Sequence, residues 1–261
     1  MKLGIIGDGA ISRYARGKAT EHGHEITALL LRPQRITEGN VDGVLRVSKV
    51  ADLPVEIEHM VDCAGHSALH AYGADILRGG IDLTTVSIGA LADQDLLDEL
   101  QQAAATGGSK LRLASGAIGA LDCLRAARVG TLTSVTYIGR KPPQSWKGSP
   151  AESRIDLDAL SSGAATHFSG SAREAATQYP KNANVAAAVA LAGIGFDRTE
   201  VELIADADVT ENIHEIEARG EFGSFSFAIR GHSLADNPRS SALAAMSVVS
   251  SLEQASQNVI F

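Results

Sequence analysis

The chain has few of the residues that build disulfide scaffolds, membrane spans or nucleic-acid-binding surfaces. Only two cysteines occur in 261 residues, Cys63 and Cys123, and both lie in apolar segments. Neither a disulfide framework nor a metal cluster is therefore expected. No apolar run reaches the length of about 18 residues that a membrane-spanning helix needs. The formal net charge of −8 argues against nucleic acid as a partner, because phosphate binding favours a basic surface.

Aromatic residues are also scarce, at 4% of the chain, so the core must be built from Ala, Val, Ile and Leu. The hydrophobic share of 44% and the charged share of 21% are ordinary for a soluble globular protein. The first residues read as a strand with one lysine and do not resemble a secretory signal. These features predict a soluble protein of the reducing cytoplasm, with one large domain or two small ones.

The most informative feature that is present lies at the N-terminus. The apolar run Lys2–Ile6 is followed at once by a glycine-rich turn and a helix-compatible segment, beginning Gly7, Asp8, Gly9, Ala10 and Ile11. Gly7 permits a tight turn, and Gly9 lets the backbone approach a pyrophosphate at the positive end of the helix. Ser12 replaces the usual third glycine but is small. The pattern predicts dinucleotide binding; the alternative is a glycine-rich structural turn.

Through about residue 115, short apolar runs alternate with helical segments. Strands are expected at Lys2–Ile6, Glu25–Leu31, Met60–Cys63, Asp82–Ser87 and Lys110–Leu113, and helices at Ala10–His22, Ser67–Gly79 and Asp93–Gly107. Continuous apolar strands joined by helices are typical of a doubly wound parallel sheet, which binds ligands beyond the carboxyl ends of its strands. Small residues gather at those ends, and the predicted cofactor contacts there include Ala64, Gly65, His66 and Ser87.

Arg32 bears on the choice between NAD and NADP. Sites that prefer NAD usually carry an acidic residue after the second strand, where it binds the ribose 2′-hydroxyl. Here that strand ends in Leu31-Arg32-Pro33 without a carboxylate. Because a guanidinium can bind a 2′-phosphate, we predict that NADP is used at least as well as NAD.

The second part of the chain has a different pattern. Strands are expected at Thr131–Arg140, Glu200–Ala205, Ile213–Arg219 and Phe222–Arg230, with helices at Asn184–Gly193 and Arg239–Gln257. A capping-box sequence at Ser171 predicts a further helix start. Adjacent strands with short turns indicate an antiparallel or mixed sheet. We expect domains at residues 1–115 and 116–237, with the helix in residues 238–261 packing back on the first and the active site at their interface.

His214 is the first candidate for catalysis, because a histidine that titrates near neutrality can give or take a proton. The alternative is a hydrogen-bonded histidine in a strand. His66 competes for the role from a strand end, whereas the other histidines are expected to be solvated. Cys123 is expected to be a buried structural thiol, since its neighbours are apolar.

A second unusual segment is Tyr179–Val185, which places polar residues just before an alanine-rich helix. Asn184 can cap that helix or bind the carboxamide of a nicotinamide. Lys181 and Arg173 can bind a carboxylate, and Asn182 joins them as a predicted substrate contact.

Taken together, these segments resemble the L-aspartate dehydrogenase family over nearly the whole chain. The matching stretches are Gly7–Ile11, Asp62–His66, Ser87–Ala90, Ser115–Ala120, Gly139–Pro142, Gly170–Ala176, Tyr179–Ala186, Leu191–Thr199, Glu211–His214 and Asn237–Pro238. Ser12, in place of a glycine, is a small departure that concerns the cofactor loop.

The resemblance implies an α/β fold, with an N-terminal Rossmann doubly wound parallel sheet and a second mixed α/β domain. It places His214 at the family's catalytic histidine and Ala117 and Asn184 at positions that contact the nicotinamide cofactor. The implied reaction is NAD(P)-dependent oxidative deamination of L-aspartate through iminosuccinate to oxaloacetate and ammonia. In the family, the imine can also feed NAD biosynthesis. The resemblance also implies a homodimer. The composition and charge described above predict a cytoplasmic protein without metal, nucleic acid or membrane partners.

Two alternatives stay open. A dehydrogenase or reductase of another small acid would share the first domain and a mixed second domain. A nucleotide-sensing protein would keep the fold without turnover, because fold alone does not determine function.

Overall fold

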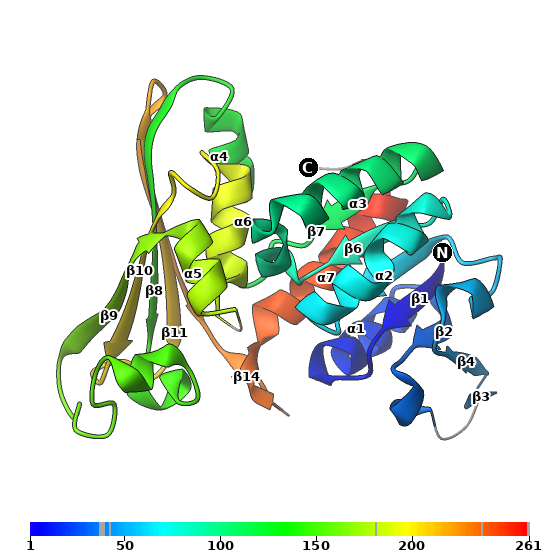
Figure 1. Ribbon diagram of the computed structural model, residues 1–261, viewed down its shortest axis with the longest axis horizontal. Helices are drawn as coiled ribbons and strands as arrows, with labels where there is room; N and C mark the ends of the chain where they lie inside the picture. The colour runs from blue at the N-terminus through cyan, green and yellow to red at the C-terminus, as the bar shows by residue number, and fades with distance from the viewer. Residues whose placement is uncertain (37–39, 42, 181, 236, 260–261) are drawn as a thin grey trace. The chain divides into compact units, whose positions relative to one another are not determined.

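The computed structural model describes residues 1–36, 40–41, 43–180, 182–235 and 237–259. It divides into two compact units, Met1–Gly116 with Ala244–Phe261, and Ala117–Leu243. Both units are α/β (Figure 1). The predicted fold class is confirmed: the first unit carries a doubly wound, mostly parallel sheet, and the second a mixed sheet with helices.

The first unit is built on a seven-stranded sheet of order β3-β4-β2-β1-β5-β6-β7, in which only the β3–β4 pair is antiparallel. Its strands are β1 (Lys2–Ile6), β2 (Glu25–Leu30), β3 (Asn40–Val41), β4 (Val44–Val47), β5 (His59–Asp62), β6 (Asp82–Thr85) and β7 (Leu111–Leu113). Its helices are α1 (Ala10–Glu21), α2 (His66–Arg78), α3 (Gln94–Gly107) and α7 (Ala242–Ser256), with short 3₁₀ turns η1 (Pro33–Arg35), η2 (Val50–Asp52) and η3 (Ile88–Ala92).

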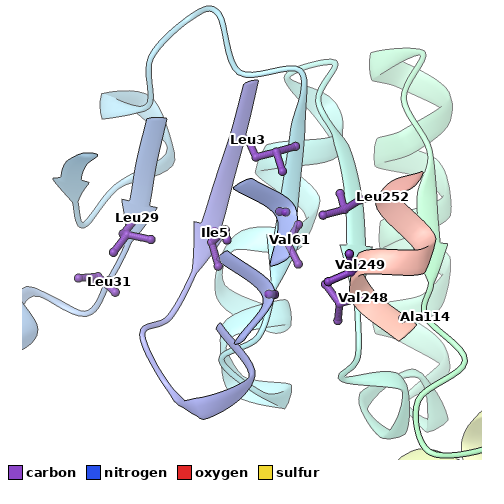
Figure 2. Packing of buried hydrophobic residues seen from close by; sticks show 11 residues of the cluster. Leu3, Ile5, Leu29, Leu31, Val61, Ala114, Val248, Val249 and Leu252 are labelled. Atoms are coloured by element: carbon purple, nitrogen blue, oxygen red, sulfur yellow. The ribbon is translucent and has the colours of Figure 1, made fainter. Parts of the chain in front are cut away.

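Figure 2 shows the packing on one face of this sheet. Leu3 and Ile5 of β1, Leu29 of β2 and Val61 of β5 lie in one buried cluster with residues of α1 and α7. The chain thus returns from the second unit to complete the first unit's core, with Val248, Val249 and Leu252 as the contribution of α7. α2 and α3 pack against each other, with α2 in contact with β5 and β6 and α3 in contact with β7, as expected of the helices of a doubly wound sheet.

The second unit has a five-stranded sheet of order β12-β11-β8-β10-β9, with β8 and β10 parallel and the other neighbours antiparallel. Its strands are β8 (Leu132–Lys141), β9 (Ala164–Ser171), β10 (Glu200–Asp206), β11 (Asn212–Gly220) and β12 (Gly223–Gly231), followed by the small pair β13 (Ser233–Leu234) and β14 (Asn237–Ser241). Its helices are α4 (Leu121–Ala127), α5 (Ala172–Gln178) and α6 (Asn184–Ala192), with 3₁₀ turns η4 (Pro143–Trp146) and η5 (Pro150–Ser153).

Two local predictions for the second unit have clear outcomes. The capping box is confirmed: the Ser171 side chain accepts the Glu174 backbone N–H, and the Glu174 carboxylate accepts the Ser171 backbone N–H. Capping by Asn184 is wrong, because α6 begins after Ala183, which occupies the N-cap position. α6 is nearly wholly buried, as an alanine-rich helix without charges must be.

Candidate active site

The glycine turn between β1 and α1 has the geometry of an anion cradle. Gly7 has φ +91°, and a Cβ there would lie 2.9 Å from the Cβ of Ala64, so only glycine fits. Gly9 is the N-cap of α1, and a Cβ there would meet open space. No side chain caps this helix, which leaves the N–H groups of its first turn, including Ala10 and Ile11, to a ligand.

Ser12 stabilises the turn in a way that a third glycine would not. Its side chain is fully buried, and its hydroxyl donates a hydrogen bond of 2.8 Å to the carbonyl oxygen of Gly7. The small side chain therefore allows close packing and also ties the first turn of α1 to the glycine loop.

A pocket of about 360 Å³ adjoins this turn at the carboxyl ends of β1, β2 and β5. This volume is within the range of small-molecule sites. Among the predicted cofactor residues, Gly7, Asp8, Gly9, Arg32 and Ala64 line it. Arg35 adds a second guanidinium, which the sequence analysis did not single out, and Asp8 is the one carboxylate among the described lining residues.

A buried carboxylate organises the next strand end. Asp62 is fully buried, and its side chain accepts hydrogen bonds from the Ala64 backbone N–H and from the hydroxyls of Thr85 and Ser87. Burial raises the pKa of Asp62, while these hydrogen bonds, from Ser87 first, oppose the increase. The Ser87 side chain is thus hydrogen-bonded inside the protein and does not line the pocket. Gly65 has φ +94° and is the N-cap of α2, whose first residue is His66.

In the second unit, His214 lies on β11 and is paired with a tyrosine. It is 5% exposed, and its Nδ1 lies 2.7 Å from the hydroxyl oxygen of Tyr137 on β8. Burial, and then the charge of Lys141, lower the pKa of His214 to about 3. The expectation that this histidine titrates near neutrality is therefore wrong, because an imidazolium would lose its hydration and face a cation.

Lys141 is a residue that the sequence analysis missed as a functional candidate. It ends β8, two residues beyond Gly139, which lies directly opposite His214 in the sheet. Its ammonium donates to the side-chain oxygen of Asn182 at 3.0 Å and lies 4.8 Å from the centre of the Trp146 ring. Burial lowers the pKa of Lys141 to about 8. The structure thus gathers His214, Lys141 and the predicted Asn182 in one unit.

Within the described residues, the structure does not place the other two predicted substrate contacts, Arg173 and Lys181, beside His214. The Arg173 guanidinium forms two hydrogen bonds with the carboxylate of Asp197 and lies 5.5 Å from the centre of the Phe196 ring. It is therefore engaged at the surface, and Lys141 is the cation placed beside His214. Lys181 lies outside the described residues. Ala117 is 8% exposed at the start of the second unit, and Asn184 is the first residue of α6.

Three expectations about other histidines and one about a cysteine are wrong. His24, His59 and His167 are buried rather than solvated. Each has a hydrogen-bonding group in reach: the N-terminal amine, the Thr84 hydroxyl and the Tyr179 hydroxyl, respectively. Cys123 is exposed on α4, since this short helix turns the residue away from its packed face. Cys63 is the more enclosed thiol, and burial raises its pKa.

Comparison with known families covers both units. Residues 3–114 match the model described as homoserine dehydrogenase, NAD binding domain, and residues 122–255 match aspartate dehydrogenase, C-terminal. A curated L-aspartate dehydrogenase of Ruegeria pomeroyi is 51% identical over 97% of this chain and 92% of its own length. The chain belongs to the L-aspartate dehydrogenase family. A second member, from Cupriavidus necator, is 43% identical over 97% of this chain and 96% of its own.

Solved structures agree with this family assignment. The aspartate dehydrogenase of Thermotoga maritima has a TM-score of 0.79 and 26% identity, and the match covers 100% of this chain and 99% of that one. A dipicolinate-bound dihydrodipicolinate reductase from Paenisporosarcina has a TM-score of 0.57 at 13% identity, covering 97% and 94% of the two chains. This second likeness is one of fold alone.

Two absences apply to the residues that the structure describes. Within them, no group of three or more His, Cys, Asp or Glu side chains is placed to hold a metal ion. None of the helices in that part of the chain is both long and apolar enough to cross a bilayer.

Proposed function

We propose that this family member oxidises L-aspartate with NAD or NADP, giving iminosuccinate and then oxaloacetate and ammonia, in a reversible reaction. The observation that carries the proposal is the match of nearly the entire chain, at 51% identity, to a curated L-aspartate dehydrogenase. The match includes both the NAD-binding domain and the aspartate dehydrogenase C-terminal domain. The likeness to a dihydrodipicolinate reductase, at 13% identity, does not favour the alternative of another small-acid reductase.

The first unit fits a dinucleotide cofactor. Open space at the Gly9 Cβ position and the uncapped start of α1 suit a pyrophosphate, while Arg32 and Arg35 suit a 2′-phosphate. When bound, NAD(P)⁺ supplies a hydride acceptor for the substrate Cα. The residues that would hold it are those of the glycine turn, Arg32 and Ala64, with Gly65, His66, Ala117 and Asn184 as further predicted contacts. The Ser87 side chain, which donates to Asp62, would not contact it.

The second unit supplies the groups for the substrate. Aspartate carries two carboxylates, which must be held so that its Cα has one orientation. Lys141 provides a cation whose position is set by Asn182 and Trp146, and His214 lies on the same face of the sheet. We assign Lys141 to carboxylate binding and His214 to the reacting end of the substrate. Arg173 is not needed for this arrangement, since Asp197 already neutralises it.

A substrate panel tests the proposal directly. Purified protein is incubated with NAD⁺ or NADP⁺ and a series of amino and hydroxy acids, and the absorbance of the reduced nicotinamide is followed. Reduction with L-aspartate, and much less with D-aspartate, L-glutamate or L-malate, is the expected result. Preferential turnover of another acid would favour the alternative dehydrogenase. Tight cofactor binding without reduction by any acid would favour a nucleotide-sensing protein.

We further propose that the protein is a homodimer that contributes iminosuccinate to NAD biosynthesis, as the family resemblance implies, and that it lies in the cytoplasm, as its composition indicates. In support of a dimer, α4, α5 and α6 lie on one side of the second unit's sheet (Figure 1). Along β11, Glu215 and Glu217 alternate with buried residues and are more exposed than they are, which indicates that the other side of the sheet is open to a partner. Analytical ultracentrifugation should give about twice the 27.2 kDa mass of one chain, and a mass of one chain would refute the dimer.

A further inference from the structure

The hydrogen bond between Tyr137 and His214 has a direction that burial fixes. The Tyr137 side chain is 1% exposed, so water is not available to its hydroxyl. Among the described residues, the one hydrogen-bond partner of that hydroxyl is Nδ1 of His214, at 2.7 Å. A buried O–H without an acceptor is costly. The tyrosine must therefore donate, and Nδ1 must accept.

An accepting Nδ1 decides where the imidazole proton lies. A neutral imidazole carries one N–H, so the proton is on Nε2. We propose that Tyr137 is a positioning residue that holds His214 in the Nε2–H tautomer, so that His214 meets the substrate as a hydrogen-bond donor and not as a base. The role of His214 toward the substrate rests on the proposed function, whereas the assignment of its tautomer does not depend on that function.

Gly139 makes the pair possible. It stands opposite His214 in the β8–β11 register, two residues from Tyr137 and on the same face. A Cβ at residue 139 would lie 2.8 Å from the Tyr137 hydroxyl oxygen and 3.1 Å from Cδ2 of Leu203. The hydroxyl therefore reaches His214 through the space that a side chain at this position would fill. The glycine belongs to the site although its backbone is ordinary strand.

The electrostatics of the site agree with a neutral ring. The described titratable groups that face His214 are Tyr137 and Lys141, and the charge of Lys141 opposes a second charge on the imidazole. Burial raises the pKa of Tyr137, so its hydroxyl keeps its proton. No described group bonds to Nε2, which leaves this N–H for a substrate oxygen. Neutral imidazole is an effective donor to such oxygens in enzymes.

The tautomer changes what His214 contributes to the reaction. An Nε2 that already carries a proton cannot accept one from the substrate ammonium. His214 instead orients or polarises an oxygen of the substrate, and the ammonium proton passes to solvent water before the hydride leaves Cα. The expected consequence is a pH dependence of kcat that contains no ionisation of His214 between pH 6 and 9.

Nitrogen NMR of protein labelled with ¹⁵N in the histidine rings determines the tautomer of His214 and does not require an activity assay. The His214 signals are identified by their absence from His214→Gln. At neutral pH, the proposal predicts a protonated Nε2 and an unprotonated Nδ1. A protonated Nδ1, or a doubly protonated ring, would overturn it, and this outcome does not depend on whether aspartate is the substrate.

Kinetics test the positioning role. Tyr137→Phe should lower kcat about 10- to 100-fold, by analogy with the loss of a partner that orients a metal-binding histidine, while the KM for aspartate stays within about threefold. Its NMR spectrum should show a mixture of His214 tautomers. Tyr14→Phe, a hydroxyl deletion on α1 of the first unit, is the matched control and should retain wild-type kcat. A Tyr137→Phe enzyme with unchanged kcat and unchanged tautomer would contradict the proposal.

Gly139→Ala provides an independent route to the same defect. Its methyl group should displace the Tyr137 hydroxyl and lower kcat. Because both changes act on one hydrogen bond, the double variant Tyr137→Phe/Gly139→Ala should be little worse than Tyr137→Phe alone. Fully additive losses would show that Gly139 acts elsewhere. If wild-type protein does not oxidise aspartate at all, the proposed function fails, and the NMR result still decides the tautomer.

Discussion

Replacing Arg32 with alanine should shift cofactor preference from NADP towards NAD. Arg32 is the second residue after β2, which ends at Leu30, and lines the pocket beside the glycine turn. No described carboxylate occupies this end of the pocket, because Asp8 belongs to the glycine turn. The ribose 2′-position of a bound dinucleotide is expected near this strand end, where a guanidinium favours a phosphate over a hydroxyl.

The size of the effect follows from the exposure of the two arginines. A hydrogen bond between charged groups contributes about 1.5–3 kcal/mol, equivalent to roughly 10- to 150-fold in affinity. Arg32 and Arg35 are both exposed, so solvent screening places each near the lower end of this range. We therefore expect Arg32→Ala to lower kcat/KM for NADP about tenfold while kcat/KM for NAD changes less than about twofold.

The assay measures kcat/KM for both cofactors at saturating aspartate. Arg35→Ala should change the ratio in the same direction, and the double variant should change it further. Arg78→Ala is the matched control, because Arg78 is an exposed arginine that pairs with Asp75 and does not line the pocket. If the ratio is unchanged in both Arg32→Ala and Arg35→Ala, the guanidinium groups do not select the 2′-phosphate and the reasoning is refuted.

Three further predictions concern binding and stability. Gly9→Ala should raise the cofactor Kd about tenfold without lowering the Tm, since φ −71° suits alanine and its methyl meets open space. Gly7→Ala should lower the Tm, because its φ of +91° and the nearby Ala64 do not suit a Cβ. Equal losses of Tm in the two variants would contradict this distinction. Lys141→Met should raise the KM for aspartate at least about tenfold and leave the cofactor Kd unchanged; an unaltered KM would exclude Lys141 from carboxylate binding. Urea unfolding should become easier from pH 7 to pH 5, by about 1–2 kcal/mol per buried histidine, because burial lowers the folded-state pKa to about 3 or 4 for His59, His167 and His214.

The sign of the pH effect follows from those lowered values. The unfolded chain binds protons at its histidines near pH 6.5, before the folded chain does. The stabilisation is therefore complete above about pH 6.5 and is lost as the pH falls towards 4 or 3. A stability that is constant between pH 7 and pH 5 would show that these histidines ionise in the folded protein.

Local chemistry explains why the first unit was predictable. The apolar strand, Gly7 and Gly9 determine a turn within a few residues, and the expected strands and helices of this unit correspond to β1, β2, β5, β6, β7 and α1 to α3. β9 was missed because Ala164–Ser171 has little strand propensity of its own. It becomes a strand through its antiparallel pairing with β10, which the sequence of this segment does not reveal.

The candidate site was predictable only in part for the same reason. His214 was accessible from its strand position and the family resemblance. Tyr137, 77 residues away in the sequence, becomes its partner through the β8–β11 register, and Lys141 joins them from the same strand. The low pKa of His214 could not be predicted from the sequence either, because burial and a neighbouring cation are properties of the folded chain. The motif Gly139-Arg140-Lys141-Pro142 was the available signal, but it did not identify which residue acts.

The kcat of His214→Ala with L-aspartate, measured at saturating cofactor, tests whether His214 acts on the substrate. Loss of this hydrogen-bond donor should lower kcat at least about 100-fold, and the NADP Kd of the variant should equal that of the wild type. Near-normal turnover by His214→Ala would contradict the assignment of the reacting end of the substrate to this histidine.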